Sequence, residues 1–130
     1  NDMGATSERL FLRDDLLELL ARQVRVRRTL LALAREHVDT VMPGYTHMVQ
    51  AQPTTLAHQL SAFAAAMERD AERWREVYAR VDASPLGVGA FTTSGYGLNR
   101  ERLRELMGLT GLVENGYDAV MVGTVDTKVE

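Results

Sequence analysis

The sequence predicts an all-α fold, in the form of a segment of a long-helix bundle. Two long stretches place apolar residues at helical spacing, and the chain between them contains two prolines that interrupt a helix. The remainder is rich in glycine and has room only for short helices. Hydrophobic residues make up 45% of the 130 residues and charged residues 25%, so the chain has enough apolar surface for a core.

The first long helix is expected from about Thr6 to Val38, after a short polar loop over Asn1 to Gly4. Two rows of apolar residues repeat with a heptad period along it: Leu10, Leu17, Val24, Leu31 and Val38, and Leu12, Leu19, Val26 and Leu33. Two adjacent rows make a face wide enough to pack against more than one neighbour. At 1.5 Å per residue this helix extends about 50 Å, which exceeds what a compact chain of this size can cover. We therefore expect partner helices from elsewhere in the chain or from other subunits.

The second long helix is expected to follow an irregular loop over Thr40 to Pro53. Pro43 begins a Pro-Gly turn signal, and Pro53 disfavours helical conformation in the residue before it. Thr54 or Thr55 then caps a helix that extends to about Ala83. Its apolar residues keep helical spacing: Leu56, Leu60, Phe63, Met67, Trp74, Val77 and Val81. Alanines beside this stripe allow close approach of another helix.

The last part of the chain is expected to combine loops with short helices. Residues Ser84 to Asn99 include four glycines without sustained periodicity, which indicates an ordered loop or a small hairpin. Asn99 is expected to cap a short helix over Arg100 to Met107, which Gly108 ends. A second loop, Leu109 to Glu114, follows, and Asn115 is expected to cap a last helix from Gly116 onward.

Composition excludes several classes of function. The net charge of −3 argues against a nucleic-acid binder, and no apolar run approaches the roughly 18 residues of a membrane span. The chain has no cysteine, so it has neither disulfides nor a thiolate metal site, which suits a reducing compartment. We expect no metal and no cofactor. The first residue is not Met and the last lies within a pattern, so we expect an internal segment of a longer protein, truncated at both ends.

One of the three histidines is the strongest candidate for chemistry. An unperturbed imidazole titrates near neutral pH and can take or give a proton. His47 is expected in a loop between two rigid helices, beside the hydroxyl of Thr46, and such loops often contain functional residues. His37 is expected to be structural, and His58 to be a packed or capping residue. From the residues alone, His47 is either an acid–base group or a surface histidine, and both interpretations stay open.

The run Pro43-Gly44-Tyr45-Thr46-His47, followed by Ala51-Gln52-Pro53, resembles the argininosuccinate lyase family of the fumarase/aspartase superfamily. Further blocks resemble that family in the same order along nearly all of the chain. They are Asn1-Asp2 with Ala5-Thr6 and Leu12-Arg13-Asp14, then Pro85-Leu86-Gly87 with Gly89-Ala90, Asn99-Arg100-Glu101, and Asn115 with Asp118-Ala119-Val120. Ordered blocks of this kind are much more specific than one short motif.

The resemblance implies that residues 1–130 are part of the central helical domain of a cytoplasmic homotetramer, with active sites shared between subunits. It implies an enzyme of arginine biosynthesis that cleaves a C–N bond of argininosuccinate and releases arginine and fumarate, without a cofactor. By resemblance, Asn1 and Thr46 bind substrate and His47 is the acid–base histidine. The family's serine loop follows later in the sequence, so the isolated 130-residue chain is expected to be inactive.

One departure from the family pattern keeps other substrates open. After Thr-His the family typically has Leu-Gln-Arg, whereas this chain has Met48-Val49-Gln50. The change removes a cation from the candidate site loop. A lyase for another N-substituted aspartate or succinate is therefore the second hypothesis, and a non-catalytic helical assembly protein is the third.

Overall fold

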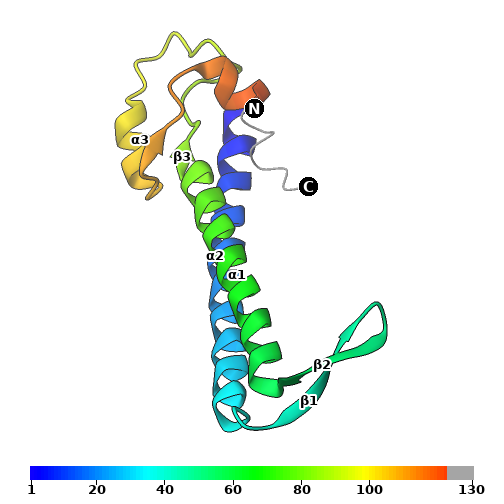
Figure 1. Cartoon of the computed structure of the whole chain (residues 1–130). Coiled ribbons are helices and arrows are strands. Elements are labelled where there is room, and N and C mark those ends of the chain that lie inside the picture. The colour runs from blue at the N-terminus through cyan, green and yellow to red at the C-terminus, as the bar shows by residue number, and fades with distance from the viewer. Residues whose placement is uncertain (123–130) are drawn as a thin grey trace. The chain divides into compact units, whose positions relative to one another are not determined.

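The structure is a computed structural model that describes residues 1–122. It divides into two compact units, Asn1–Leu17 together with Trp74–Glu130, and Glu18–Arg73. Two long helices, α1 (Asp2–Glu36) and α2 (Leu56–Val81), contribute to both units, and their segments lie side by side within each unit (Figure 1). The mainly helical class predicted from the sequence is confirmed.

Helix α1 begins earlier than predicted. The Asn1 carbonyl accepts a hydrogen bond from the Ala5 amide at 3.0 Å, and the Thr6 hydroxyl donates to the Asp2 carbonyl at 2.6 Å. The expected loop over Asn1 to Gly4 is therefore wrong. The acidic side chain of Asp2 lies in the first turn, where a negative charge interacts favourably with the positive end of the helix dipole. Together with tertiary contacts, this outweighs the low helix propensity of Gly4.

In the second unit, polar side chains of α1 reach the backbone of α2. Gln23 donates to the Met67 carbonyl at 2.7 Å, and Arg27 donates to the Ala64 carbonyl at 3.2 Å. Arg27 also pairs with Glu68 at 2.7 Å. Ala64 is fully buried, as expected where a small side chain allows two helices to approach closely.

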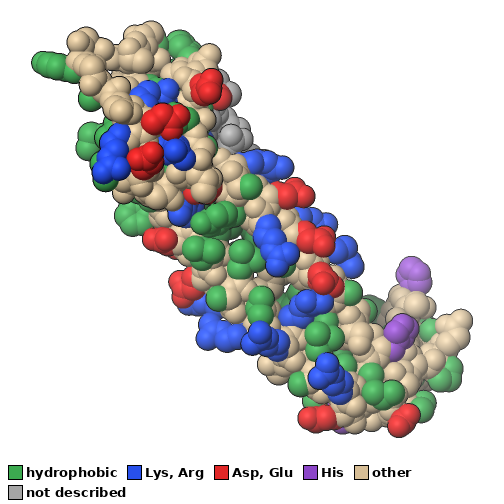
Figure 2. Space-filling model, turned by 90° about the vertical axis from the view of Figure 1, so that its left-hand side faces the viewer, with side chains coloured by type: hydrophobic (Ala, Val, Ile, Leu, Met, Phe, Trp, Pro, Cys, Tyr) green, Lys and Arg blue, Asp and Glu red, His purple; other side chains and the backbone are tan. Residues whose placement is uncertain are grey.

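The apolar rows of α1 are incompletely covered within this chain. Leu17, Val24 and Val26 remain between 43% and 50% exposed. On the face shown in Figure 2, apolar side chains lie among acidic and basic ones. This exposure fits the expectation that partner helices complete the packing, and that expectation stays a prediction. No helix of residues 1–122 is both long and apolar enough to cross a membrane.

The segment between the helices is a β-hairpin, so the expected irregular loop over Thr40 to Pro53 is wrong. Strand β1 (Val41–Thr46) pairs with β2 (Val49–Thr55) in antiparallel orientation, and the register shifts between Pro43 and Tyr45. The two prolines do not prevent pairing because they lie opposite each other. Neither has an amide hydrogen, and each strand of a two-stranded ribbon has a free edge where proline is tolerated.

Helix α2 begins as predicted. The Thr55 hydroxyl accepts a hydrogen bond from the His58 amide at 3.2 Å, the geometry of an N-cap. The helix ends at Val81, before the predicted Ala83, because Ala83 enters strand β3 (Ala83–Ser84). This strand pairs in parallel with β4 (Gly111–Leu112), which the sequence did not predict.

The two remaining predicted caps are confirmed. The Asn99 side chain caps α3 (Arg100–Leu106) by accepting from the Arg102 amide at 2.9 Å. Asn115 accepts from the amides of Tyr117 and Asp118, ahead of the π-helical turn η1 (Asp118–Val122). Any continuation of the last predicted helix past residue 122 lies outside the described residues. Ala119 and Val120 of η1 pack with buried Val88 in the core of the first unit.

Candidate functional site

Thr46 and His47 lie at the tip of the β1–β2 hairpin, in the second unit. Thr46 is the last residue of β1 and pairs with Val49, so His47 and Met48 form a two-residue turn. Their φ angles are +49° and +64°. Positive φ at both central residues matches the type I′ turn, whose twist fits a hairpin. The turn therefore projects the His47 side chain away from the paired backbone, where it is exposed.

Neither turn residue is a glycine, although the left-handed region favours glycine. Histidine tolerates it better than most residues, whereas methionine has no polar group to stabilise it locally. A non-glycine residue held there costs about 1 kcal/mol, and such strain is common at functional sites. Met48 is 99% exposed, so packing within the described chain does not compensate for this cost.

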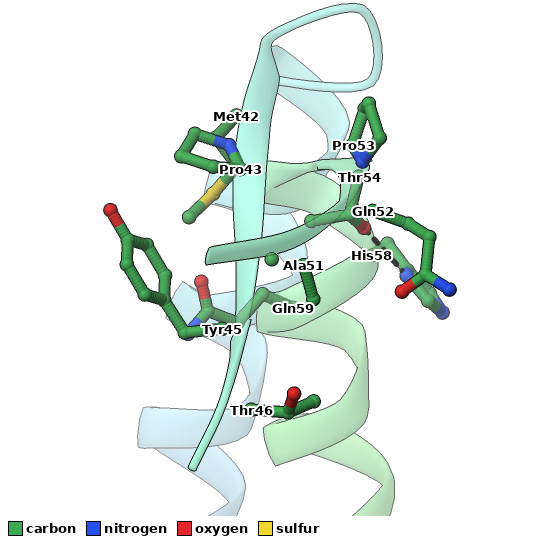
Figure 3. A pocket seen from close by; sticks show the side chains of 11 residues that line it. Met42, Pro43, Tyr45, Thr46, Ala51, Gln52, Pro53, Thr54, His58 and Gln59 are labelled. Atoms are coloured by element: carbon green, nitrogen blue, oxygen red, sulfur yellow. Dashed lines mark hydrogen bonds between the residues drawn. The ribbon is translucent and has the colours of Figure 1, made fainter. Parts of the chain in front are cut away.

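A pocket of about 450 Å³ lies between the hairpin and the start of α2 (Figure 3). Both strands and the first turn of α2 line it: Met42, Pro43, Gly44, Tyr45, Thr46, Ala51, Gln52, Pro53, Thr54, His58 and Gln59. Hydroxyl, carboxamide and imidazole groups are thus present around one hollow. The pocket includes Thr46, whereas the His47 side chain is not part of its lining.

His58 belongs to this pocket, which the sequence analysis did not predict. Its Nδ1 atom lies 2.8 Å from the Thr54 hydroxyl oxygen, the contact drawn as a dashed line in Figure 3. This hydrogen bond orients the imidazole ring and engages Nδ1, so Nε2 is the ring nitrogen left for a ligand. The available signal was a threonine just before the predicted helix start and a histidine four residues later, a spacing at which a residue ahead of a helix can reach a side chain of its first turn.

Asn1 lies in the other unit, at the start of α1, and its side chain is exposed. The structure therefore brings two of the three predicted site residues, Thr46 and His47, together on one hairpin and places the third in the first unit. Their roles in substrate binding and proton transfer stay predictions. Within residues 1–122, no group of three or more His, Asp or Glu side chains is arranged to hold a metal ion.

Comparisons with known proteins identify the relatives of this chain. A family model described as Lyase matches residues 1–129. Argininosuccinate lyase from Methanosarcina acetivorans is 51% identical over 120 residues, which cover 92% of this chain and 24% of the relative. The corresponding enzyme from Methanosarcina barkeri is 52% identical over the same length. The chain thus spans about a quarter of the length of the curated relatives it matches.

Solved structures show the same fold. A crystal structure of EDDS lyase in complex with formate has a TM-score of 0.92 and 37% sequence identity, covering 98% of this chain and 26% of that one. A variant of EDDS lyase with bound fumarate matches with the same values. The family model covers almost the whole chain, and the resemblance predicted from the ordered sequence blocks is confirmed. The chain belongs to the lyase family.

Proposed function

We propose that the protein containing this chain is a C–N lyase that cleaves argininosuccinate to arginine and fumarate. The observation that supports this most strongly is the presentation of Thr46 and His47 on a strained hairpin tip, in a chain half identical to argininosuccinate lyases. The bound fumarate in the EDDS lyase variant supports the same product class. Such an enzyme would work in the cytoplasm, in arginine biosynthesis.

The reaction is an elimination. A base removes the proton from the carbon next to a carboxylate, and that electron pair forms the C=C bond of fumarate. The C–N bond breaks, its electron pair leaves on nitrogen, and the amine takes a proton. The intermediate carries extra negative charge on the carboxylate, so the site needs hydrogen-bond donors aimed at it.

We propose that this chain provides three groups to the site. The Thr46 hydroxyl and the Asn1 carboxamide donate hydrogen bonds to the substrate, and His47 gives a proton to the leaving nitrogen. Its exposed position on the hairpin suits delivery into a site completed by other parts of the protein. The base that takes the carbon proton comes from outside residues 1–130.

We propose that the other parts of the site come from a homotetramer in which this chain forms part of the central helical domain. The half-exposed rows of α1 support this assembly, because apolar side chains in heptad register are suited to packing against neighbouring helices. Shared sites also account for a catalytic hairpin whose tip has few contacts within its own chain. An isolated chain of residues 1–130 would then lack turnover.

A second candidate function is elimination of a different amine from an N-substituted succinate. The hairpin tip favours it, since Met48-Val49-Gln50 departs from the family pattern at the residues next to His47. The similarity to EDDS lyase, at 37% identity, supports it as well. The higher identity to argininosuccinate lyases favours the first candidate.

The test offers the full-length protein argininosuccinate and, separately, other N-succinyl amines, while fumarate is followed by its absorbance. We expect fumarate release from argininosuccinate at the highest kcat/KM. Release only from another N-succinyl amine would replace the first candidate with the second. Absence of fumarate from every substrate would reject both and favour a non-catalytic helical assembly protein.

A further inference from the structure

Asp2 connects the start of α1 to the glycine-rich segment. One carboxylate oxygen, Oδ2, accepts hydrogen bonds from the backbone amides of Gly87 and Gly89, each at 2.9 Å. The other oxygen accepts the amide of the adjacent Met3 at 2.9 Å. The two glycines lie 85 and 87 residues away in sequence, so this is a tertiary connection within the first unit and not only a helix cap.

The Gly87–Gly89 turn is built to receive a carboxylate. Gly87 and Gly89 have φ angles of +91° and +64°, and a left-handed backbone of this kind points nearby amide hydrogens into one anion-binding concavity. Val88, between them, is completely buried and anchors the turn in the core. Hydrogen bonds from two amides to one charged oxygen are of the stronger, charge-assisted kind.

Arg100 also contacts this turn. Its Nε donates to the Leu86 carbonyl at 3.1 Å, and its terminal nitrogens donate to the carbonyls of Val113 and Glu114. A side chain at Gly87 would meet this arginine, because a Cβ there would lie 2.8 Å from Arg100 Cγ. The turn is therefore held by Arg100 as well as by its bonds to Asp2.

We infer that Asp2 is a positioning residue that sets the location of Asn1 for substrate. This inference rests on the proposed function, in which Asn1 binds substrate. Asn1 precedes Asp2 directly, and its carbonyl is hydrogen-bonded to the Ala5 amide, so its backbone follows the first turn of α1. Its side chain has no hydrogen-bond partner among residues 1–122. The link from Asp2 to the glycine turn anchors that first turn at the residue next to Asn1.

Kinetics of the full-length protein test this role. Asp2→Ala is expected to lower kcat/KM for fumarate release by about tenfold, mainly through a higher KM, because it removes a charge-assisted pair of hydrogen bonds. Asp2→Asn keeps one acceptor oxygen without the charge and is expected to recover part of the loss. Asp15→Asn removes the same charge from an exposed site on α1 in the same unit, and is the matched control. It is expected to leave kcat/KM unchanged.

A purely structural role of Asp2 would give a different result in combination with Asn1. If Asp2 acts through Asn1, the double variant Asn1→Ala/Asp2→Ala has the kcat/KM of Asn1→Ala alone, because the positioned group is already absent. Independent, multiplied losses would overturn the inference. Asp2→Asn preserves the shape of the side chain, and the same cycle with this variant decides the matter if Asp2→Ala fails to fold.

Hydrogen–deuterium exchange provides a readout that does not depend on turnover. The Gly87 and Gly89 amides are expected to exchange faster in Asp2→Ala than in wild type and in Asp15→Asn. Unchanged exchange would show that Asp2 does not accept hydrogen bonds from these two amides and would overturn the inference in an active enzyme. A wild-type protein that releases no fumarate from any N-succinyl amine instead rejects the proposed function and, with it, the substrate role of Asn1.

Discussion

Arg13 of α1 and Asp82, just after α2, form an ion pair at 3.1 Å in the first unit, with side-chain exposures of 19% and 8%. Asp82 Oδ1 has no other polar partner within residues 1–122, while Oδ2 accepts the Thr110 hydroxyl at 2.6 Å. Arg13 also donates to the Gly108 carbonyl and lies over the Tyr78 ring. This one pair therefore connects α1, the end of α2 and the segment that leads into β4.

Arg13→Ala is expected to destabilise the protein by about 3 kcal/mol, because it leaves a buried carboxylate without its cation. The measurement is the free energy of unfolding of the full-length protein in denaturant. Arg22→Ala is the matched control, since Arg22 pairs with Glu18 on an exposed helix face and its loss is expected to cost less than about 0.5 kcal/mol. Equal effects of the two changes would contradict the conclusion that the buried Asp82 carboxylate depends on the charge of Arg13.

His47→Ala in the full-length enzyme is expected to lower kcat by about 10²- to 10⁴-fold, the usual contribution of a positioned acid or base. The exposed hairpin tip makes little contact with the rest of its own chain, so the thermal stability and the oligomeric state are expected to persist. His37→Ala makes the same chemical change in the turn after α1, outside the hairpin, and is expected to leave kcat close to wild type. Near-normal turnover of His47→Ala would remove this residue from the mechanism.

Met48→Gly is expected to raise the free energy of unfolding by about 0.5 to 1 kcal/mol. Glycine adopts the left-handed conformation of this turn position without the penalty of a Cβ atom, although part of the gain is offset by entropy of the unfolded chain. Val49→Gly, one residue later within β2, is the control and is expected to be destabilising. Loss of stability in Met48→Gly would indicate that contacts of the exposed methionine outside this chain outweigh the backbone strain.

Gly87→Ala is expected to destabilise the first unit by about 1 to 3 kcal/mol, the cost of holding a non-glycine residue in a strained conformation. The new Cβ also requires Arg100 to move. Gly95→Ala provides the comparison, because a Cβ at Gly95 meets no atom within 4 Å and its φ is not positive. Thermal unfolding of both variants measures the difference, and a tolerated alanine at Gly87 would show that the turn adapts freely.

Local sequence signals determined the helices and their caps. Apolar spacing identified both long helices, and Thr55, Asn99 and Asn115 cap as predicted, because each cap bond joins residues two or three positions apart. Such interactions depend on neighbouring residues alone. The ordered blocks around Thr46-His47 likewise indicate the lyase family from the sequence alone.

Tertiary structure decided the rest, because pairing partners are set by distant residues. In the sequence, Pro43 and Pro53 predict only an interruption between two helices, whereas the structure places them opposite each other in a β-hairpin. The parallel β3–β4 pair and the bond from Asp2 to the glycine turn join residues tens of positions apart. His58 lines the pocket only because the hairpin lies beside the start of α2 in the folded chain. A pattern in one segment identifies that segment's conformation, whereas the partner of a polar group depends on the whole fold.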